Sequence, residues 1–99
     1  MEITKVQIHL NKEEDKAVKA FADIIIDNEF IVRGLCILKG REDIFYVTMP
    51  NKLKKDGTRQ DIAHPISEDC RRYVEDTVLD EYEKVLNLML QRSYNTPKG

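Results

Sequence analysis

The sequence predicts an α+β fold, in which an antiparallel sheet of four to five strands is followed by a C-terminal amphipathic helix. Apolar residues recur with a period of two over most of residues 1–49, which is typical of half-buried antiparallel strands. The turn-forming pair Asp27-Asn28 and the glycine Gly40 interrupt this alternation, so they predict tight turns between strands. From Ser67 onward the apolar spacing changes to three and four, as expected for one face of a helix.

The first two predicted strands each carry an apolar face. Val6, Ile8 and Leu10 share one face of the first strand. After a polar turn over residues 11–16, the second strand places five apolar residues on one face: Val18, Ala20, Ala22, Ile24 and Ile26. Phe21 and Ile25 occupy the opposite face, so we expect a helix or another subunit to cover part of it.

The third predicted strand, residues 30–38, has apolar residues on both sides, so we expect it at the centre of the sheet and buried on both faces. Gly34 indicates a bulge or a close approach. Simple alternation divides the apolar residues into two sides, one with Phe30, Val32, Cys36 and Leu38 and the other with Ile31, Leu35 and Ile37.

Two shorter strands are predicted next. Residues 44–49 form a fourth strand that ends at Pro50, because proline has no amide proton to donate to a sheet. Asp56-Gly57 is a turn signal, and residues 58–63 form a short fifth strand that ends at His64-Pro65 and is expected at an edge.

Ser67 predicts the start of the helix, since its side-chain oxygen can accept a hydrogen bond from an early helical amide. The apolar stripe then runs to about Leu90, through Cys70, Val74, Val78, Tyr82, Val85 and Met89. Additional leucines widen this stripe near its end. Either the last turns pack against a partner, or the helix ends near Asn87 and the chain folds back. Residues 91–99 have no periodicity and are expected to form a flexible tail.

The composition fits one compact domain over residues 1–90. A chain of 99 residues with 41% hydrophobic content is too short for two cores, and a second copy would bury additional apolar area, so we expect a homodimer. No apolar run is long enough to span a membrane, and the N-terminus shows no signal peptide. These observations predict a cytoplasmic protein without a membrane partner.

The sequence predicts no catalytic site, no metal site and no cofactor. Cys36 and Cys70 are expected to be buried, reduced thiols. A zinc site built from these cysteines with His64 and Asp61 would lack the paired spacing of structural zinc ligands. We expect the His64 imidazole to hold a turn by a hydrogen bond rather than to act as a general base. The common nucleotide-binding and nucleophile motifs are missing, so we expect no enzymatic activity.

The segment of residues 49–67 is the strongest functional signal. Its four cationic side chains are Lys52, Lys54, Lys55 and Arg59. They outnumber two aspartates, so the segment has a net charge of +2 in a chain whose total is −2. Long cations around a turn can follow a phosphate backbone, and Arg71 and Arg72 in the first helical turns are candidates to join them. An ordinary solvated loop and a contact with an acidic protein remain alternatives.

Three strings of residues resemble the SpoVG family of bacterial septation and sporulation regulators. They are IIDNEFIV, FYVTMPNK and, most specifically, DGTRQDIAHPIS. The similarity extends from Met1 to about Tyr82. The resemblance implies a small antiparallel sheet followed by a helix, a homodimer, and a regulator that binds DNA and RNA and influences septum formation and gene expression. Other regulatory proteins are a further class of expected partner.

Carried over residue by residue, the family's expected nucleic-acid contacts fall on Lys52 and Arg71. Leu53 and Gln60 stand where the family usually has arginine, whereas Lys54, Lys55 and Arg59 are basic where the family commonly is not. The resemblance therefore implies that binding to phosphate is kept, while the arrangement of the charges has changed.

Overall fold

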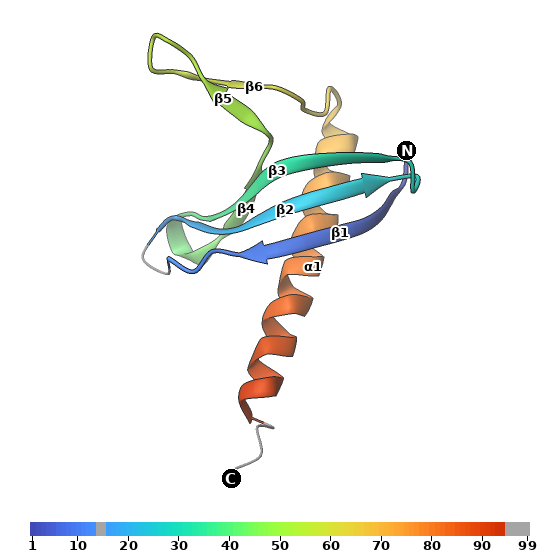
Figure 1. Ribbon diagram of the computed structural model, residues 1–99, viewed down its shortest axis with the longest axis vertical. Helices are drawn as coiled ribbons and strands as arrows, with labels where there is room; N and C mark the ends of the chain where they lie inside the picture. The colour runs from blue at the N-terminus through green and yellow to red at the C-terminus, as the bar shows by residue number, and fades with distance from the viewer. Residues whose placement is uncertain (14–15, 95–99) are drawn as a thin grey trace.

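A computed structural model describes residues 1–13 and 16–94 as a four-stranded antiparallel sheet, a separate two-stranded hairpin and one long helix. The strands of the main sheet follow one another in the order β1-β2-β3-β4. Their bounds are Ile3–Leu10, Val18–Ile26, Phe30–Lys39 and Phe45–Thr48. The helix α1, Glu68–Tyr94, crosses one face of this sheet (Figure 1). The predicted α+β class is confirmed.

Local turn chemistry sets the order of the strands. Asp27 and Asn28 both have positive φ angles, 52° and 57°, which suit the tight hairpin between β2 and β3. Between β3 and β4 the chain forms a short 3₁₀ turn, Arg41–Asp43. Part of the polar turn predicted over residues 11–16, namely residues 14–15, lies outside the described residues.

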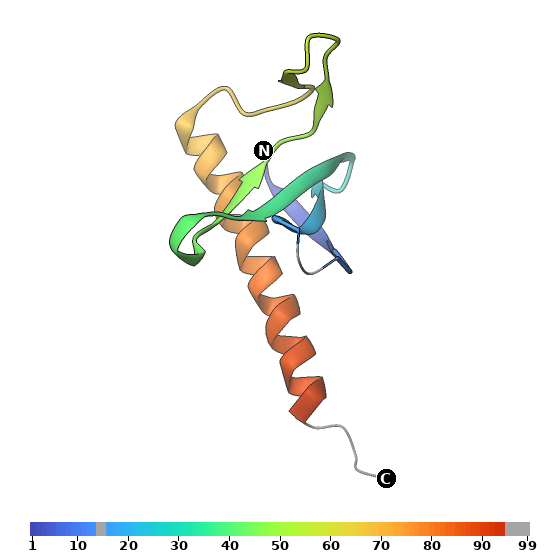
Figure 2. The same cartoon turned by 90° about the vertical axis from the view of Figure 1, so that its left-hand side faces the viewer.

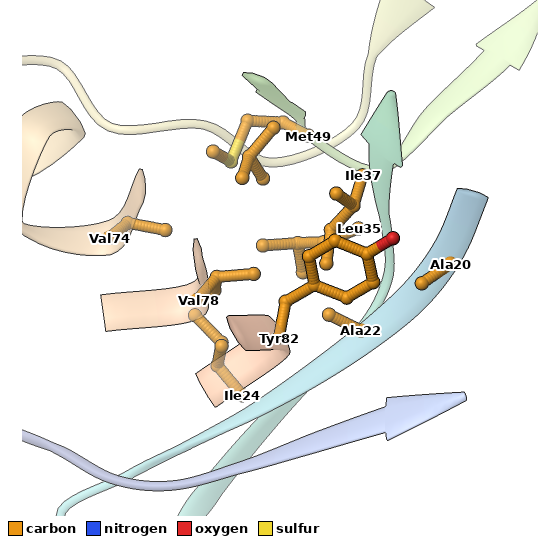
Figure 3. Packing of buried hydrophobic residues seen from close by; sticks show 10 residues of the cluster. Ala20, Ala22, Ile24, Leu35, Ile37, Met49, Val74, Val78 and Tyr82 are labelled. Atoms are coloured by element: carbon orange, nitrogen blue, oxygen red, sulfur yellow. The ribbon is translucent and has the colours of Figure 1, made fainter. Parts of the chain in front are cut away.

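The core lies between the sheet and the helix, as Figure 3 shows. Ala20 and Ala22 are fully buried, and these small side chains allow the helix to approach β2 closely. Leu35 and Ile37 of β3 and Val78 of α1 fill the centre of this layer. The phenol ring of Tyr82 packs at 5.5 Å, centroid to centroid, from the ring of Phe45 on β4.

Hydrogen bonds to Tyr73 and Glu75 attach the helix to the sheet. The Ile3 amide of β1 donates to the Tyr73 hydroxyl at 2.9 Å, and the Val47 amide of β4 donates to Glu75 Oε2 at 3.4 Å. The two strands stand at opposite edges of the sheet, so the helix is fixed at both sides.

Gly34 forms a β-bulge, and this bulge changes the predicted faces of β3. Ala22 of β2 pairs with Leu35, but Ile24 pairs with Val32, so β3 contains one extra residue between the two pairs. Gly34 has a φ of +88°, a conformation that favours glycine. Val32 therefore shares the core face with Leu35 and Ile37, not with Cys36 and Leu38 as simple alternation predicted.

The central position of β3 is confirmed, but its predicted burial on both faces is wrong. On the face away from the helix Ile31 is 40% exposed, and Cys36 and Leu38 are half-buried. In Figure 2 the helix lies on one side of the sheet, and no second helix covers the other side in the described part of the chain.

The predicted fifth strand exists but does not join the main sheet. It is the strand β6, Arg59–Asp61, and it pairs with β5, Asn51–Leu53, which the sequence did not predict. Pro50 ends β4 and redirects the chain into this separate hairpin, since proline cannot continue the ladder. The hairpin projects from the body of the protein (Figure 1).

The helix begins where it was predicted and ends later. Ser67 Oγ accepts a hydrogen bond from the Cys70 amide at 3.1 Å, which confirms the N-cap. The helix continues to Tyr94, beyond the predicted end near Leu90, because residues 87–94 contain good helix formers and no glycine or proline. Met89, expected in the apolar stripe, is 47% exposed. Residues 95–99 of the expected tail lie outside the described residues.

Candidate nucleic-acid interface

The β5–β6 hairpin places four of the six candidate cations on one projecting element. Lys52 lies on β5, Arg59 on β6, and Lys54 and Lys55 at the turn between them. All four side chains are exposed. The hairpin is short and contributes no residue to the buried core, so its side chains are free to contact a partner.

The turn of the hairpin is held by Asp56. Its Oδ1 accepts hydrogen bonds from the amide of Thr58 at 3.0 Å and from the hydroxyl of the same residue at 2.6 Å. These hydrogen bonds hold the pKa of the Asp56 carboxyl below its usual value, with the side-chain bond the larger cause. Gly57 has a φ of +89°, a conformation that glycine adopts without strain, so it suits this position of the turn. The amide of Lys54 bonds to the carbonyl of Thr58 at 2.7 Å.

The register of the hairpin separates its cations onto two faces. Lys52 stands opposite Gln60, and Leu53 stands opposite Arg59, so Lys52 and Arg59 point to different sides. Arg59 Nη1 donates a hydrogen bond to Asn51 Oδ1 at 3.0 Å. The side-chain amide of Asn51 also donates to the Met49 carbonyl at 2.9 Å, so Arg59 is held in place at the base of the hairpin.

Arg71 and Arg72 lie in the first turns of the helix, and both are exposed. The hairpin and the helix start stand at the same end of the molecule in Figures 1 and 2, joined by residues 62–67. The tip of the hairpin points away from the helix start in both views. The fold thus brings the two groups of cations to one end of the protein but leaves them as separate groups.

The six candidate cations at this end of the protein form no ion pair with a carboxylate in the described part of the chain. Among residues 1–13 and 16–94, Lys39 forms an ion pair with Asp43 at 3.0 Å, and His9 Nε2 is hydrogen-bonded to Asp23 Oδ2 at 3.1 Å. Neither pair involves the six candidate cations. A cation without a carboxylate partner in the described part of the chain is available to neutralise an external anion.

His64 and the two cysteines were also weighed as candidate site residues. His64 Nδ1 bonds to the carbonyl of Pro65 at 2.9 Å, which confirms the hydrogen-bonded imidazole expected at this turn. Cys36 and Cys70 are free thiols, each half-buried. Within the described ranges, no three residues among histidine, cysteine, aspartate and glutamate are placed to hold a metal ion. The described helix is too polar to cross a lipid bilayer.

An apolar pocket of about 300 Å³ lies beside this end of the protein. It is formed by strand residues such as Ile24 and Leu35, by Met49 just after β4, by the helix residue Val74, and by the connecting segment 63–66. Ile66 at its rim is 96% exposed and the nearby Ile62 is 67% exposed. The sequence did not single out this pocket, since its walls come from strands, a connecting segment and a helix that are distant along the chain.

Comparison with known proteins assigns the chain to a family. The family model SpoVG matches residues 1–84. Among the similar proteins, one from Bdellovibrio bacteriovorus is 39% identical over 90% of this chain and 80% of its own length. Another, from Archaeoglobus fulgidus, is 41% identical over 84% of this chain and 95% of its own length.

A third, from Anaeromyxobacter sp. strain K, is 42% identical over 87% of this chain and 82% of its own length. All three carry the name "Putative septation protein SpoVG", which describes a role in septation and names no enzymatic reaction. The resemblance inferred from the strings IIDNEFIV, FYVTMPNK and DGTRQDIAHPIS is confirmed, and this chain belongs to the SpoVG family.

Proposed function

We propose that this protein is a dimeric, non-enzymatic regulator that acts in the cytoplasm by binding DNA or RNA through the β5–β6 hairpin. The observation that supports the proposal best is the projecting hairpin, whose four cations are exposed and have no ion-pair partner in the described part of the chain. Arg71 and Arg72 at the helix start add a second contact group at the same end.

Contacts with phosphates rather than with base edges fit this hairpin. Its lysines carry flexible point charges, and residues 51–61 contain no aromatic side chain on which a base could stack. Arg59 is the exception among the cations, because Asn51 holds its guanidinium group in a defined position. Affinity should therefore depend mainly on electrostatics and on salt concentration.

The experiment is a salt titration of binding to duplex DNA and to single-stranded RNA by electrophoretic mobility shift. We expect a variant with Lys52, Lys54, Lys55 and Arg59 replaced by alanine to bind more weakly to every sequence. Its plot of log affinity against log salt concentration should flatten by about 0.9 for each duplex DNA phosphate that the variant no longer neutralises.

A matched control removes the same charge elsewhere on the protein. Lys12, Lys16, Arg41 and Lys84 are exposed and lie outside the hairpin and the helix start. Their replacement by alanine should leave most of the affinity and most of the salt slope. Equal reductions of affinity in the two quadruple variants would show that net charge, and not the hairpin, determines binding.

A protein-interaction module of the division machinery is the second candidate function. The apolar pocket and the exposed Ile62 and Ile66 favour it, because exposed apolar groups around a concave site are typical of protein contacts. Nuclease-treated extract distinguishes the two. A defined partner protein that no longer binds after Ile62→Ser and Ile66→Ser substitution, together with no nucleic-acid binding at low salt, would favour this candidate.

A further inference from the structure

The apolar pocket beside the helix start reaches into the core of the protein. Leu35 in its wall is fully buried, and Met49 and Val74 are only 6% and 3% exposed. Figure 3 shows the Val74 side chain of the helix directed toward Leu35 of the sheet. A concave site with walls from a sheet, a helix and a connecting segment can surround a small molecule on several sides.

One wall of the pocket is the second half of the string DGTRQDIAHPIS. The cations of the hairpin account for the first half of this string, but Ala63, His64, Pro65 and Ile66 carry none of them. All four of these residues line the pocket. Ile66 at the rim is 96% exposed, so a ligand that covers it removes apolar surface from water.

His64 supplies a hydrogen-bonding group to the pocket. Its Nδ1 lies 2.9 Å from the carbonyl oxygen of Pro65. A carbonyl oxygen can only accept a hydrogen bond, so Nδ1 carries the hydrogen, and Nε2 of the neutral ring is then an acceptor. No hydrogen bond occupies Nε2 in the described part of the chain. This nitrogen is therefore available to a donor on a ligand.

The volume and the lining of the pocket limit the ligand. An apolar cavity of about 150 Å³ takes one benzene molecule, so the pocket of about 300 Å³ has room for about ten to twelve non-hydrogen atoms. No side chain of lysine, arginine, aspartate or glutamate from the described residues lines it. A phosphate or a carboxylate would lose its hydration there without compensation, which favours an uncharged ligand.

We propose that this pocket binds a small uncharged molecule that is apolar except for one hydrogen-bond donor, which His64 Nε2 accepts. The apolar part of the ligand lies against Leu35, Met49 and Val74. The site is separate from the phosphate contacts of the hairpin, although its wall of residues 63–66 follows closely on β6. A protein partner could place only a single side chain so far into the core.

The first test compares indole with indene by titration into the isotope-labelled protein, followed by nuclear magnetic resonance. The two probes have the same shape and the same number of non-hydrogen atoms, but only indole has an N–H donor. We expect both to bind with dissociation constants between micromolar and millimolar and to shift the amide signals of residues 63–66 and Val74.

His64→Asn tests the hydrogen bond to the ligand. The asparagine amide can still donate to the Pro65 carbonyl, but it places no acceptor at the position of Nε2. The ratio of indole affinity to indene affinity should fall by about two- to tenfold, because only indole loses a hydrogen bond. An unchanged ratio would overturn the role of Nε2 as the acceptor.

Cys70→Phe tests the location of the site. Cys70 lines the pocket from the first turns of the helix, so a ring at this position fills the space and should abolish binding of both probes. Leu88→Phe is the matched control, because Leu88 is 60% exposed on the same helix and lies outside the pocket. Circular dichroism and urea unfolding identify a variant that fails to fold.

The Cys70 thiol gives a second measurement without a filled pocket. In Cys36→Ser the remaining thiol is Cys70, and saturating indole should slow its reaction with a maleimide. In Cys70→Ser the remaining thiol is Cys36, on the sheet face away from the helix, and indole should leave its rate unchanged.

Three results would each overturn the proposed site: no shift of the pocket signals at millimolar indole, binding of indole to folded Cys70→Phe, or equal protection of the two thiols. A pocket that excludes both probes but still binds the partner protein of the second candidate function would belong to that protein instead. These measurements contain no nucleic acid, so their outcome is independent of the result for the quadruple hairpin variant.

Discussion

Arg59 Nη1 donates a hydrogen bond to Asn51 Oδ1 at 3.0 Å across the two strands of the projecting hairpin. Leu53, not Asn51, stands directly opposite Arg59, so this is a diagonal contact along one face of the hairpin. It fixes the only arginine of the hairpin before any partner binds.

Replacement of Asn51 by alanine should weaken nucleic-acid binding without removing a charge. The Arg59 side chain is then no longer restrained and must be ordered on binding, at a cost of about 0.5–1.5 kcal/mol. We expect affinity to fall by about two- to tenfold with an unchanged salt slope, measured by the same salt titration. Gln60→Ala is the control, since this amide lies on the other face of the hairpin. Equal effects of the two substitutions would contradict the role of Asn51.

Asp56→Asn should strengthen binding. The asparagine oxygen can still accept the hydrogen bonds of Thr58, so the turn is kept while one negative charge is removed beside Lys54 and Lys55. We expect affinity to rise several-fold at low salt and to return to the wild-type value at high salt, because the added attraction is screened.

The pKa of Asp56 adds a pH test to the prediction for Asp56→Asn. Because hydrogen bonds from Thr58 hold this pKa below the ordinary value of 3.8, the wild-type carboxylate stays predominantly charged when the pH is well above that value. Mild acidification should therefore not reproduce the effect of Asp56→Asn. A wild-type affinity that rises to that of the variant well above pH 3.8 would contradict this assignment.

Leu35→Ala should destabilise the protein strongly. Leu35 is fully buried on β3 under the helix, and removal of a buried leucine side chain costs about 2–5 kcal/mol. Urea unfolding followed by circular dichroism measures this destabilisation. Leu53→Ala is the matched control, because Leu53 is 63% exposed and should change the free energy of unfolding by less than about 0.5 kcal/mol.

Much of the main sheet could be predicted from sequence because each of its strands obeys a local rule. Alternation identifies β1 and β2, and the residues Asp27 and Asn28 identify the turn that joins β2 to β3. The faces of β3 could not be predicted by the same rule. Gly34 signals a bulge, but only the pairing with β2 shows that the extra residue moves Val32 to the core face.

The candidate site, too, was predictable from sequence only in part. The charges of Lys52, Lys54, Lys55 and Arg59 are visible in the sequence, and their clustering needs no structure. The strand β5 is only three residues long, which is too short for an alternating pattern to predict it. The contact of Arg59 with Asn51 depends on the register of β5 against β6 and is visible only in the folded chain.

The open face of the main sheet, on the side away from the helix, could be predicted only in part. The apolar residues Phe21 and Ile25 indicated that a second layer covers this face, and both a helix and another subunit were possible. The helix covers only one face of the sheet, and this is the face that carries the buried Ala20 and Ala22. The other face thereby remained open.

Tyr82 should make the stability of the protein sensitive to alkaline pH. Burial raises the pKa of its phenol above 10.0, although the nearby charge of Lys39 opposes this. In the unfolded chain the phenol ionises near pH 10, while in the folded chain it stays neutral to higher pH. The unfolded state therefore releases its proton first, and the free energy of unfolding should fall as the pH rises above about 10.

Tyr82→Phe is the variant that isolates this group. Phenylalanine keeps the ring that packs on Phe45 and removes the ionisable hydroxyl, so its stability should fall less at alkaline pH than that of the wild type. Tyr46→Phe is a control of the same chemistry, since Tyr46 is 42% exposed. Urea unfolding over a series of alkaline buffers gives the comparison. If the stability of Tyr82→Phe and of the wild type fell equally above about pH 10, the burial of the phenol would not be the cause.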